Sequence, residues 1–356
     1  MGPERTDLQS GVTVVSEPRP GAESVAIGLY FPTGSRHETR LNNGISHFLE
    51  HLLFKGTPTR SSDEINREID VLGGLSNAYT SKEVLCFHAS VLPEHLERLI
   101  ALYTDLIAHG LAPGLEEEVD RERAVILQEI SAVEDSPEDL VGDLADVAFF
   151  GDHPLALPVV GQAAAVKRLD LAQVRSHSRQ HLVTESLVVA AAGRIDHAGL
   201  TALVERHTRD IPRGERPRLQ DPPEPGTGTR VVERDLEQVH LCLSGRGILR
   251  DDPRRAVAEA LSCIVGEGYS SRLFRGVRDR RGLAYSVGSS FASYSDAGTW
   301  NVWAGVAPER LAEALAVIGE VLGDLRDRGV LDEELEAQID EVLEKGYKLY
   351  QQRGWV

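Results

Sequence analysis

The sequence predicts an α+β protein of two similar halves, each with helices layered on a β-sheet. Apolar runs of strand length alternate with amphipathic stretches along the 356 residues. The order of strands and helices before residue 220 returns after residue 229, as in a duplicated domain. A segment rich in Pro and Gly at 221–229 cannot continue a regular element. We therefore expect domains at 1–212 and 230–356, joined by a linker at 213–229.

The first half is predicted to hold one nearly apolar helix, within residues 44–56, among strands and amphipathic helices. Ser61 or Ser62 can cap the helix that follows it. The expected strands are 11–16, 24–31, 75–80, 83–92 and 186–193, and the other expected helices are 62–72, 94–109, 115–133, 166–181 and 196–208.

The second half repeats this order but stops earlier. Its expected strands are 229–234, 238–244, 283–293 and 299–306, and its expected helices are 253–265, 270–279, 308–328 and 331–349. No counterpart of the last strand and helices of the first half follows, so the second domain is expected to be incomplete, with an open sheet edge and apolar surface. We expect either a shortened form of a longer protein or an association that covers the gap, most simply a homodimer.

The pattern His47-x-x-Glu50-His51 is the strongest chemical signal in the chain. Two imidazoles four residues apart on a helix lie on one face and can reach a single metal ion. Glu50 lies beside them, where it can take a proton from water. The surrounding residues are almost all apolar, so the three ionisable side chains need partners inside a buried helix, and a metal ion supplies one. On the overlay of the two halves, the corresponding helix around 256–261 has no histidine, so the second half cannot bind a like metal.

Composition narrows the classes of partner and compartment. The formal net charge of −18 argues against nucleic acid or an anionic membrane as partner, and favours basic peptides. Cys86, Cys242 and Cys263 are too few and too far apart for a disulfide framework or a cysteine zinc site. The N-terminal residues lack the pattern of a secretory signal, and no stretch has the length of a membrane-spanning helix. The expected location is the cytoplasm.

The chain resembles the pitrilysin/insulinase family of zinc peptidases, whose inverted motif is His-x-x-Glu-His. It is most similar to the bacterial relatives of the mitochondrial processing peptidase β subunit. The resemblance rests on residues 33–36, 44–57, 73–80 and 278–285. It implies two homologous domains facing each other across a chamber, one binding zinc and the other inactive and lining the substrate.

The resemblance also implies the remaining metal ligand. In the family this ligand is a glutamate after the apolar run of a helix such as 115–133, and a second glutamate two turns earlier supports it. Carried over, Glu129 is the third ligand of one Zn²⁺ per chain and Glu122 is the supporting carboxylate. Their spacing of seven residues puts both on one helix face.

Two further pairs of residues match family positions that contact substrate. Arg278 and Tyr285 correspond to the arginine and tyrosine that the inactive half directs at the zinc site, where both donate to developing negative charge. The alternative is that Arg278 is a surface residue and Tyr285 is an ordinary aromatic residue of a strand, without a role in catalysis. Asn77 and Ala78 correspond to an edge strand to which an extended peptide adds. The alternative is an edge strand of no special function.

These observations predict a zinc metalloendopeptidase that hydrolyses extended peptides or unfolded segments. One alternative is a non-catalytic or partner-dependent subunit of a heteromeric processing peptidase, although such subunits usually lose motif residues. The other is a small-molecule lyase, because an autoinducer-synthesising lyase also uses a His-x-x-Glu-His metal site. That lyase is a much shorter chain and has a cysteine ligand. The expected partners are peptide substrates, and a second copy of the chain or a related subunit.

Overall fold

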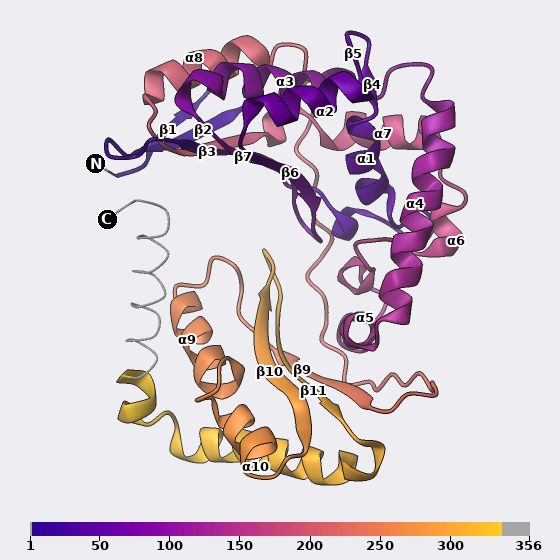
Figure 1. Ribbon diagram of the computed structural model, residues 1–356, viewed down its shortest axis with the longest axis vertical. Helices are drawn as coiled ribbons and strands as arrows, with labels where there is room; N and C mark the ends of the chain where they lie inside the picture. The colour runs from indigo at the N-terminus through magenta and orange to yellow at the C-terminus, as the bar shows by residue number, and fades with distance from the viewer. Residues whose placement is uncertain (1, 337–356) are drawn as a thin grey trace. The chain divides into compact units, whose positions relative to one another are not determined.

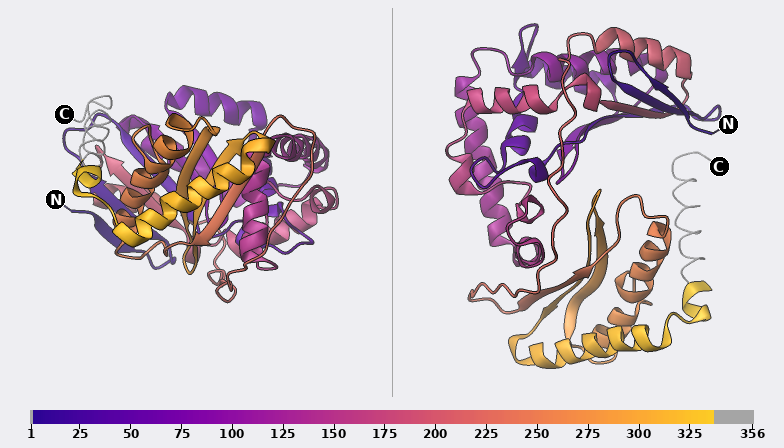
Figure 2. Two further views of the ribbon diagram at one scale, coloured as in Figure 1. Left: turned by 90° about the horizontal axis from the view of Figure 1, so that it is seen from below. Right: turned by 180° about the vertical axis from the view of Figure 1, so that it is seen from behind.

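The chain forms two compact units in the computed structural model, which describes residues 2–336. The first unit comprises Met1–Ala132 and Leu157–Gln220, and the second comprises Val133–Ala156 and Asp221–Val356. The second unit thus takes Val133–Ala156 from within the predicted first domain. Residues 212–236 form no helix or strand, and their extended path is visible in Figure 2.

The first unit is built on a six-stranded sheet with the order β1-β2-β8-β3-β7-β6. Strand β8 lies between β2 and β3, parallel to β2 and antiparallel to β3. Strand β6 lies at an edge of the sheet, and among the described residues its pairing partner is β7 alone. The strands are β1 (Glu4–Asp7), β2 (Thr13–Pro18), β3 (Val25–Phe31), β6 (Leu75–Thr80), β7 (Leu85–Val91) and β8 (Val188–Gly193), with β4 (Gly56–Thr57) and β5 (Arg60–Ser61) forming a separate small hairpin.

Helices α2, α3 and α8 lie along one face of this sheet (Figure 1). Apolar side chains of the helices and strands form one large core, which includes the five buried apolar residues of α1. The predicted helix at 166–181 is divided into two helices. The second, α7, begins after Asp170, which caps its N-terminus. The helices are α1 (Ile45–Leu53), α2 (Ser62–Leu72), α3 (Leu96–His109), α4 (Glu116–Asp135), α6 (Ala163–Val166), α7 (Leu171–His181) and α8 (His197–His207).

The N-terminus of α1 is capped by a carboxylate from outside the helix. Gly44 occupies the N-cap position with φ of 95°, where it offers no side chain. The fully buried Glu38 carboxylate takes its place, accepting hydrogen bonds from the Gly44 N–H at 2.7 Å and the Ser46 N–H at 2.8 Å. It also accepts one from the Asn43 amide at 2.8 Å. Glu38 therefore satisfies the free donors of the helix and complements its dipole.

A cluster of three histidines packs beside the same helix terminus. The His177 and His181 rings of α7 lie 4.2 Å apart between centroids, and the His37 ring lies 5.6 Å from that of His181. His177 Nε2 lies 3.0 Å from Ser46 Oγ of α1. Burial, and next the charge of neighbouring His181, lowers the pKa of His177 to about 3. Burial also lowers the pKa values of His37 and His181 to about 4, so the folded cluster is neutral near pH 7.

The second unit contains a three-stranded antiparallel sheet with the order β10-β11-β9. This order repeats β6-β7-β3 of the first unit, so the predicted duplication is visible in the topology. Its apolar core lies between the sheet and its helices. The elements are α5 (Pro137–Phe150), β9 (Val239–Arg246), α9 (Arg255–Gly266), a π-helix (Phe274–Asp279), β10 (Ala284–Ser293), β11 (Gly298–Val306) and α10 (Leu311–Arg328).

The predicted strand at 229–234 is wrong, and the sheet of the first unit shows why. There β2 enters the sheet by pairing with β8 and not with β3. Among residues 2–336, no strand occupies the corresponding place beside β9, so residues 229–234 have no strand to join. Val231 is accordingly 77% exposed.

Other predicted elements differ less. Residues 270–279 form a turn of α-helix that continues as a π-helix. The helix α5 was not predicted. Most of the predicted helix at 331–349 lies outside the described residues.

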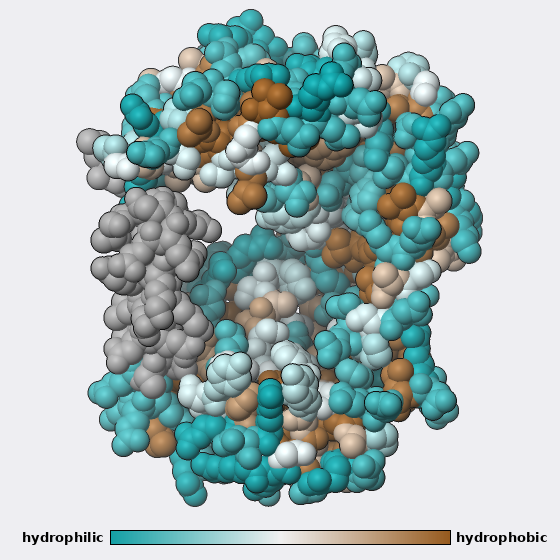
Figure 3. Space-filling model, viewed as in Figure 1, coloured by the Kyte–Doolittle hydropathy of each residue, from teal (hydrophilic) through white to brown (hydrophobic). Residues whose placement is uncertain are grey.

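The surface visible in Figure 3 is mainly hydrophilic, with apolar residues scattered over it. Within residues 2–336, no helix combines the length and apolar character needed to cross a bilayer.

Replacing Glu38 should destabilise the first unit strongly. Glu38→Ala leaves the Gly44 and Ser46 N–H groups buried without acceptors, so we expect a loss on the order of 3 kcal/mol in the free energy of unfolding. Urea unfolding of the metal-free protein, followed by far-ultraviolet circular dichroism, measures it. Tryptophan fluorescence is unsuitable because residues 1–220, which include the whole first unit, contain no tryptophan.

The matched control is Asp196→Ala, which removes a carboxylate that caps α8 through the Gly199 N–H at the surface. Loss of an exposed cap costs about 1 kcal/mol. Equal losses for the two variants would contradict the role assigned to the buried carboxylate.

Acid should destabilise the first unit through the histidine cluster. The folded pKa of His177, about 3, lies below its unfolded value of 6.5. The unfolded chain therefore binds more protons below pH 6.5, and stability falls as pH drops from 6.5 toward 3, by up to about 1.4 kcal/mol per pH unit for one histidine. His177→Gln should flatten the dependence of the urea midpoint on pH between 7 and 5 in metal-free protein. An unchanged slope would show that His177 titrates normally.

Candidate metal centre

Helix α1 presents its three ionisable side chains together. His47 and His51 lie one turn apart, and their ring centroids are 4.6 Å apart with the planes at 77°. Glu50 lies on the same helix, with its carboxylate directed at β6. The apolar residues of α1 pack into the core, which fixes this face of the helix relative to the sheet.

Glu129 reaches the two histidines from helix α4. Its Oε2 lies 3.5 Å from His47 Nε2 and 3.8 Å from His51 Nε2. Ligands bound to zinc at about 2.0–2.1 Å in a tetrahedron lie about 3.4 Å from one another, so the three atoms fit a zinc ion with little movement. Among the described residues, these three form the one group of His, Cys, Asp or Glu side chains close enough to bind a metal ion.

The electrostatics of the histidines suit metal binding. Burial, and next the charge of His51, lowers the pKa of His47 to about 4. Its imidazole is therefore neutral near pH 7, which is the form that binds a metal. Glu129 is the most exposed of the three, with 41% of its side chain accessible.

Glu122 orients His51 from behind. Its Oε2 lies 2.9 Å from His51 Nδ1, which leaves Nε2 for the metal. Its Oε1 pairs with Lys55 Nζ at 2.7 Å. The hydrogen bonds from Lys55 and His51 outweigh burial and lower the pKa of Glu122, so it stays ionised. Glu122 thus contacts His51, and its role as the supporting carboxylate stays a prediction.

Glu50 is held by a residue of the edge strand β6. The Thr80 hydroxyl donates to Glu50 Oε2 at 2.5 Å. Burial raises the pKa of Glu50, and the Thr80 hydrogen bond opposes that rise. A carboxylate with a raised pKa accepts a proton more readily than one in water.

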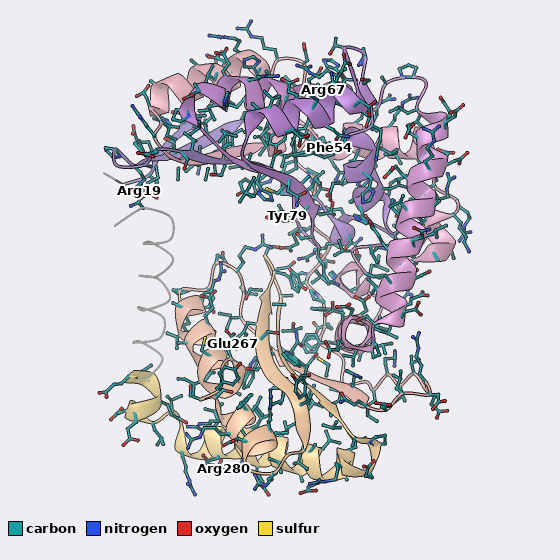
Figure 4. The ribbon with its side chains drawn as sticks, in the orientation of Figure 1. Arg19, Phe54, Arg67, Tyr79, Glu267 and Arg280 are labelled. Carbon is teal, nitrogen blue, oxygen red and sulfur yellow. The ribbon has the colours of Figure 1, made fainter. Side chains whose placement is uncertain are left out.

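The predicted peptide-binding residues lie next to the metal centre. Asn77 and Ala78 belong to β6, and the Asn77 side-chain oxygen accepts a hydrogen bond from the Ala78 N–H at 2.9 Å. A cavity of about 290 Å³ opens between this strand, α1 and α2. Phe54 and Ile69 give it an apolar wall, and Glu50 and His51 reach it from the metal centre. Phe54 and Tyr79 are labelled in Figure 4.

Arg278 and Tyr285 lie together in the second unit. The Arg278 guanidinium stacks 4.6 Å from the centroid of the Tyr285 ring and 4.8 Å from that of Phe274. The π-helix therefore presents a cation between two aromatic rings. Tyr285 is 75% exposed, so its hydroxyl is accessible. The roles of Arg278 and Tyr285 stay predictions.

Lys55 and Thr80 are residues that the sequence did not predict for the site. Lys55 follows His51 by four residues, a spacing that places it near the helix face of the histidines. Thr80 gave no signal beyond its place in the stretch 73–80, because its contact with Glu50 joins residues thirty positions apart.

Two family models match this chain one after the other. The family described as insulinase, peptidase family M16, matches residues 13–163, and the peptidase M16 inactive domain matches residues 168–342. An uncharacterized zinc protease of Mycobacterium tuberculosis is 40% identical over 342 residues, covering 94% of this chain and 77% of the relative. The zinc protease YmxG of Bacillus subtilis is 36% identical over 333 residues, covering 94% of this chain and 81% of its own.

Solved structures share the fold. A peptidase M16 inactive-domain protein from Pseudomonas fluorescens aligns with a TM-score of 0.91 at 20% identity, over 99% of this chain and 87% of its own. A protease from Helicobacter pylori aligns with a TM-score of 0.88 at 22% identity, over 99% and 86%. The predicted mixed α/β fold of two domains is confirmed, and the identity with named zinc proteases shows that the chain belongs to the insulinase family of peptidases, family M16.

Proposed function

We propose that the protein is a zinc-dependent endopeptidase that hydrolyses extended peptides or unfolded segments. The observation that carries this proposal is the convergence of His47, His51 and Glu129, whose ligand atoms lie within 4.8 Å of one another, beside Glu50, which Thr80 holds separately. One zinc ion per chain fits this set. When bound, zinc supplies a Lewis acid that lowers the pKa of water and polarises a carbonyl.

The residues of the chain have distinct roles in this proposal. Glu50 takes the proton of the attacking water and delivers it to the leaving amine, which a buried carboxylate with a raised pKa can do. Glu122 keeps His51 in the tautomer whose Nε2 is available. Tyr285 donates to the oxygen of the scissile carbonyl, and Arg278 binds the substrate backbone.

The edge strand β6 supports an extended peptide as the substrate. Its outer edge has no partner strand among the described residues, so a peptide can add there through main-chain hydrogen bonds. Asn77 and Ala78 lie at the centre of that edge, where the Ala78 N–H must leave the Asn77 side chain to pair with substrate. The adjacent cavity accepts an apolar side chain beside Phe54 and Ile69. The net charge of −18 favours basic peptides.

The donor set argues against the lyase alternative. That chemistry requires a cysteine ligand, whereas Cys86 is buried in β7 and the described metal-binding group contains two histidines and a glutamate. A non-catalytic subunit is also disfavoured, because all the motif residues are present and positioned. Association with a second copy or a related subunit stays a prediction.

Changing Glu50 should separate catalysis from metal binding. Glu50→Gln removes the proton acceptor but no ligand, so we expect peptide cleavage to fall by at least about 100-fold while about one zinc per chain is retained. His51→Ala, the comparison variant, should lose the metal. Cleavage of an unstructured basic peptide and metal analysis of the dialysed proteins give both numbers. Near wild-type cleavage by Glu50→Gln would refute the general-base assignment.

Changing Tyr285 should test whether the second unit takes part in chemistry. Tyr285→Phe removes one hydrogen-bond donor and keeps the ring that stacks on Arg278. We expect kcat to fall while KM changes little, the pattern of an interaction made chiefly in the transition state. Tyr269→Phe is the matched control, since Tyr269 is equally exposed at 80% but lies outside the predicted site. Identical kinetics for Tyr285→Phe and the wild type would make Tyr285 structural.

A further inference from the structure

The strand that holds Glu50 ends in a tightly closed hairpin. Thr80 is the last residue of β6 and pairs with Leu85, the first of β7. The Ser81 N–H donates to the Val84 carbonyl at 2.7 Å across the turn, and the Ser81 hydroxyl contacts the same oxygen at 3.1 Å. The backbone position of Thr80 is therefore fixed from the turn side.

A buried ion pair anchors this hairpin to the segment before α1. Arg36 Nη1 lies 2.5 Å from Glu83 Oε1, with 0% and 4% of the two side chains exposed. The Arg36 N–H donates to the Lys82 carbonyl at 2.8 Å, and the Ser35 N–H to the Ser81 carbonyl at 3.2 Å. Main-chain hydrogen bonds and an ion pair thus connect the turn after Thr80 to Ser35 and Arg36. A buried pair of this kind needs complete geometry to be stable, so it tolerates little movement of the turn.

The fixed turn aims one hydroxyl at the general base. Thr80 Oγ1 donates to Glu50 Oε2 at 2.5 Å, a short bond to an ionisable acceptor. Glu50 has several rotatable bonds, and a partner at one oxygen reduces the orientations open to its carboxylate. Thr80 lies on β6, far in sequence from the metal ligands. It can therefore orient the Glu50 carboxylate independently of α1.

We propose that Thr80 is a positioning residue for Glu50. Its hydroxyl holds Oε2 and so turns Oε1 toward the water that attacks the peptide bond. This inference rests on the proposed function, because it assigns Thr80 a role only through the proton transfer by Glu50. It also places peptide binding and base orientation on one strand, since Asn77 and Ala78 precede Thr80 on β6.

Two substitutions at Thr80 test the proposal. Thr80→Val keeps the shape and removes the donor, so we expect kcat to fall about 10- to 100-fold, as for loss of a hydrogen bond to a charged group. KM should change by less than about threefold, and zinc affinity measured by chelator competition should not change, because substrate and metal contacts remain. Thr80→Ser keeps a hydroxyl and should recover most of the lost kcat.

Thr13→Val is the matched control. Thr13 is also a strand threonine that donates to a carboxylate, Asp7 Oδ1 at 2.8 Å, on the far side of the sheet order from β6. It should leave kcat, KM and zinc affinity unchanged.

The outcomes are distinct. A Thr80→Val enzyme with wild-type kcat overturns the inference, as does a loss of zinc affinity or a loss of activity that Thr80→Ser does not recover. If Glu50→Gln remains active, the proposed function fails instead. If Glu50→Gln is inactive and zinc-loaded while Thr80→Val is fully active, the inference on Thr80 alone fails.

Discussion

The metal centre depends on the burial of one carboxylate at the start of helix α1. Glu38 replaces the cap that Gly44 cannot provide, and its fully buried position ties the helix to the loop before it. Gly44 in turn packs against Gly161, where a Cβ atom on either residue would approach the other within 2.9 Å. A side chain at position 44 could cap the helix locally, but it would prevent this close packing. His47 directly follows Ser46, which Glu38 holds. Any shift of this helix terminus therefore moves the first candidate metal ligand.

The two functions proposed for α1, metal binding and proton transfer, depend on contacts from different elements. Glu122 of α4, which pairs with Lys55, orients His51, whereas Thr80 reaches Glu50 from β6. The supports share no residue, so a change in the binding strand can alter the base without disturbing the ligands. Such a separation lets a site keep its metal while its catalytic geometry responds to what occupies the edge of the sheet.

The sequence predicted the parts of the site that are local and missed those that are distant. His47, Glu50 and His51 are visible because helical spacing alone brings them together. Glu129 and Glu122 came from family resemblance, since spacing fixed only their shared face. The contacts of Thr80 with Glu50 and of Arg36 with Glu83 join residues whose proximity the strand pairing decides, and no periodicity reports it.

The fold shows the same division. The duplication was readable because β9, β11 and β10 repeat the pattern of β3, β7 and β6. The strand at 229–234 was wrongly predicted, because its apolar residues suit a strand but its pairing depends on a neighbouring strand that residues 2–336 do not contain. The helix α5 was overlooked although Ser136, Pro137 and Glu138 form a helix start, and its grouping with the second unit follows from contacts far along the chain.

The insertion of β8 between β2 and β3 sets an order of events during synthesis on the ribosome. Strands β2 and β3 are made early, but they become joined only through β8, about 170 residues later. The metal-binding helix is thus translated long before the sheet that supports it can close, and closure over so long a loop is slow. During that interval β2 can pair with β1 and β3 with β7, but the edge of each strand that β8 later joins stays open, and open strand edges promote aggregation.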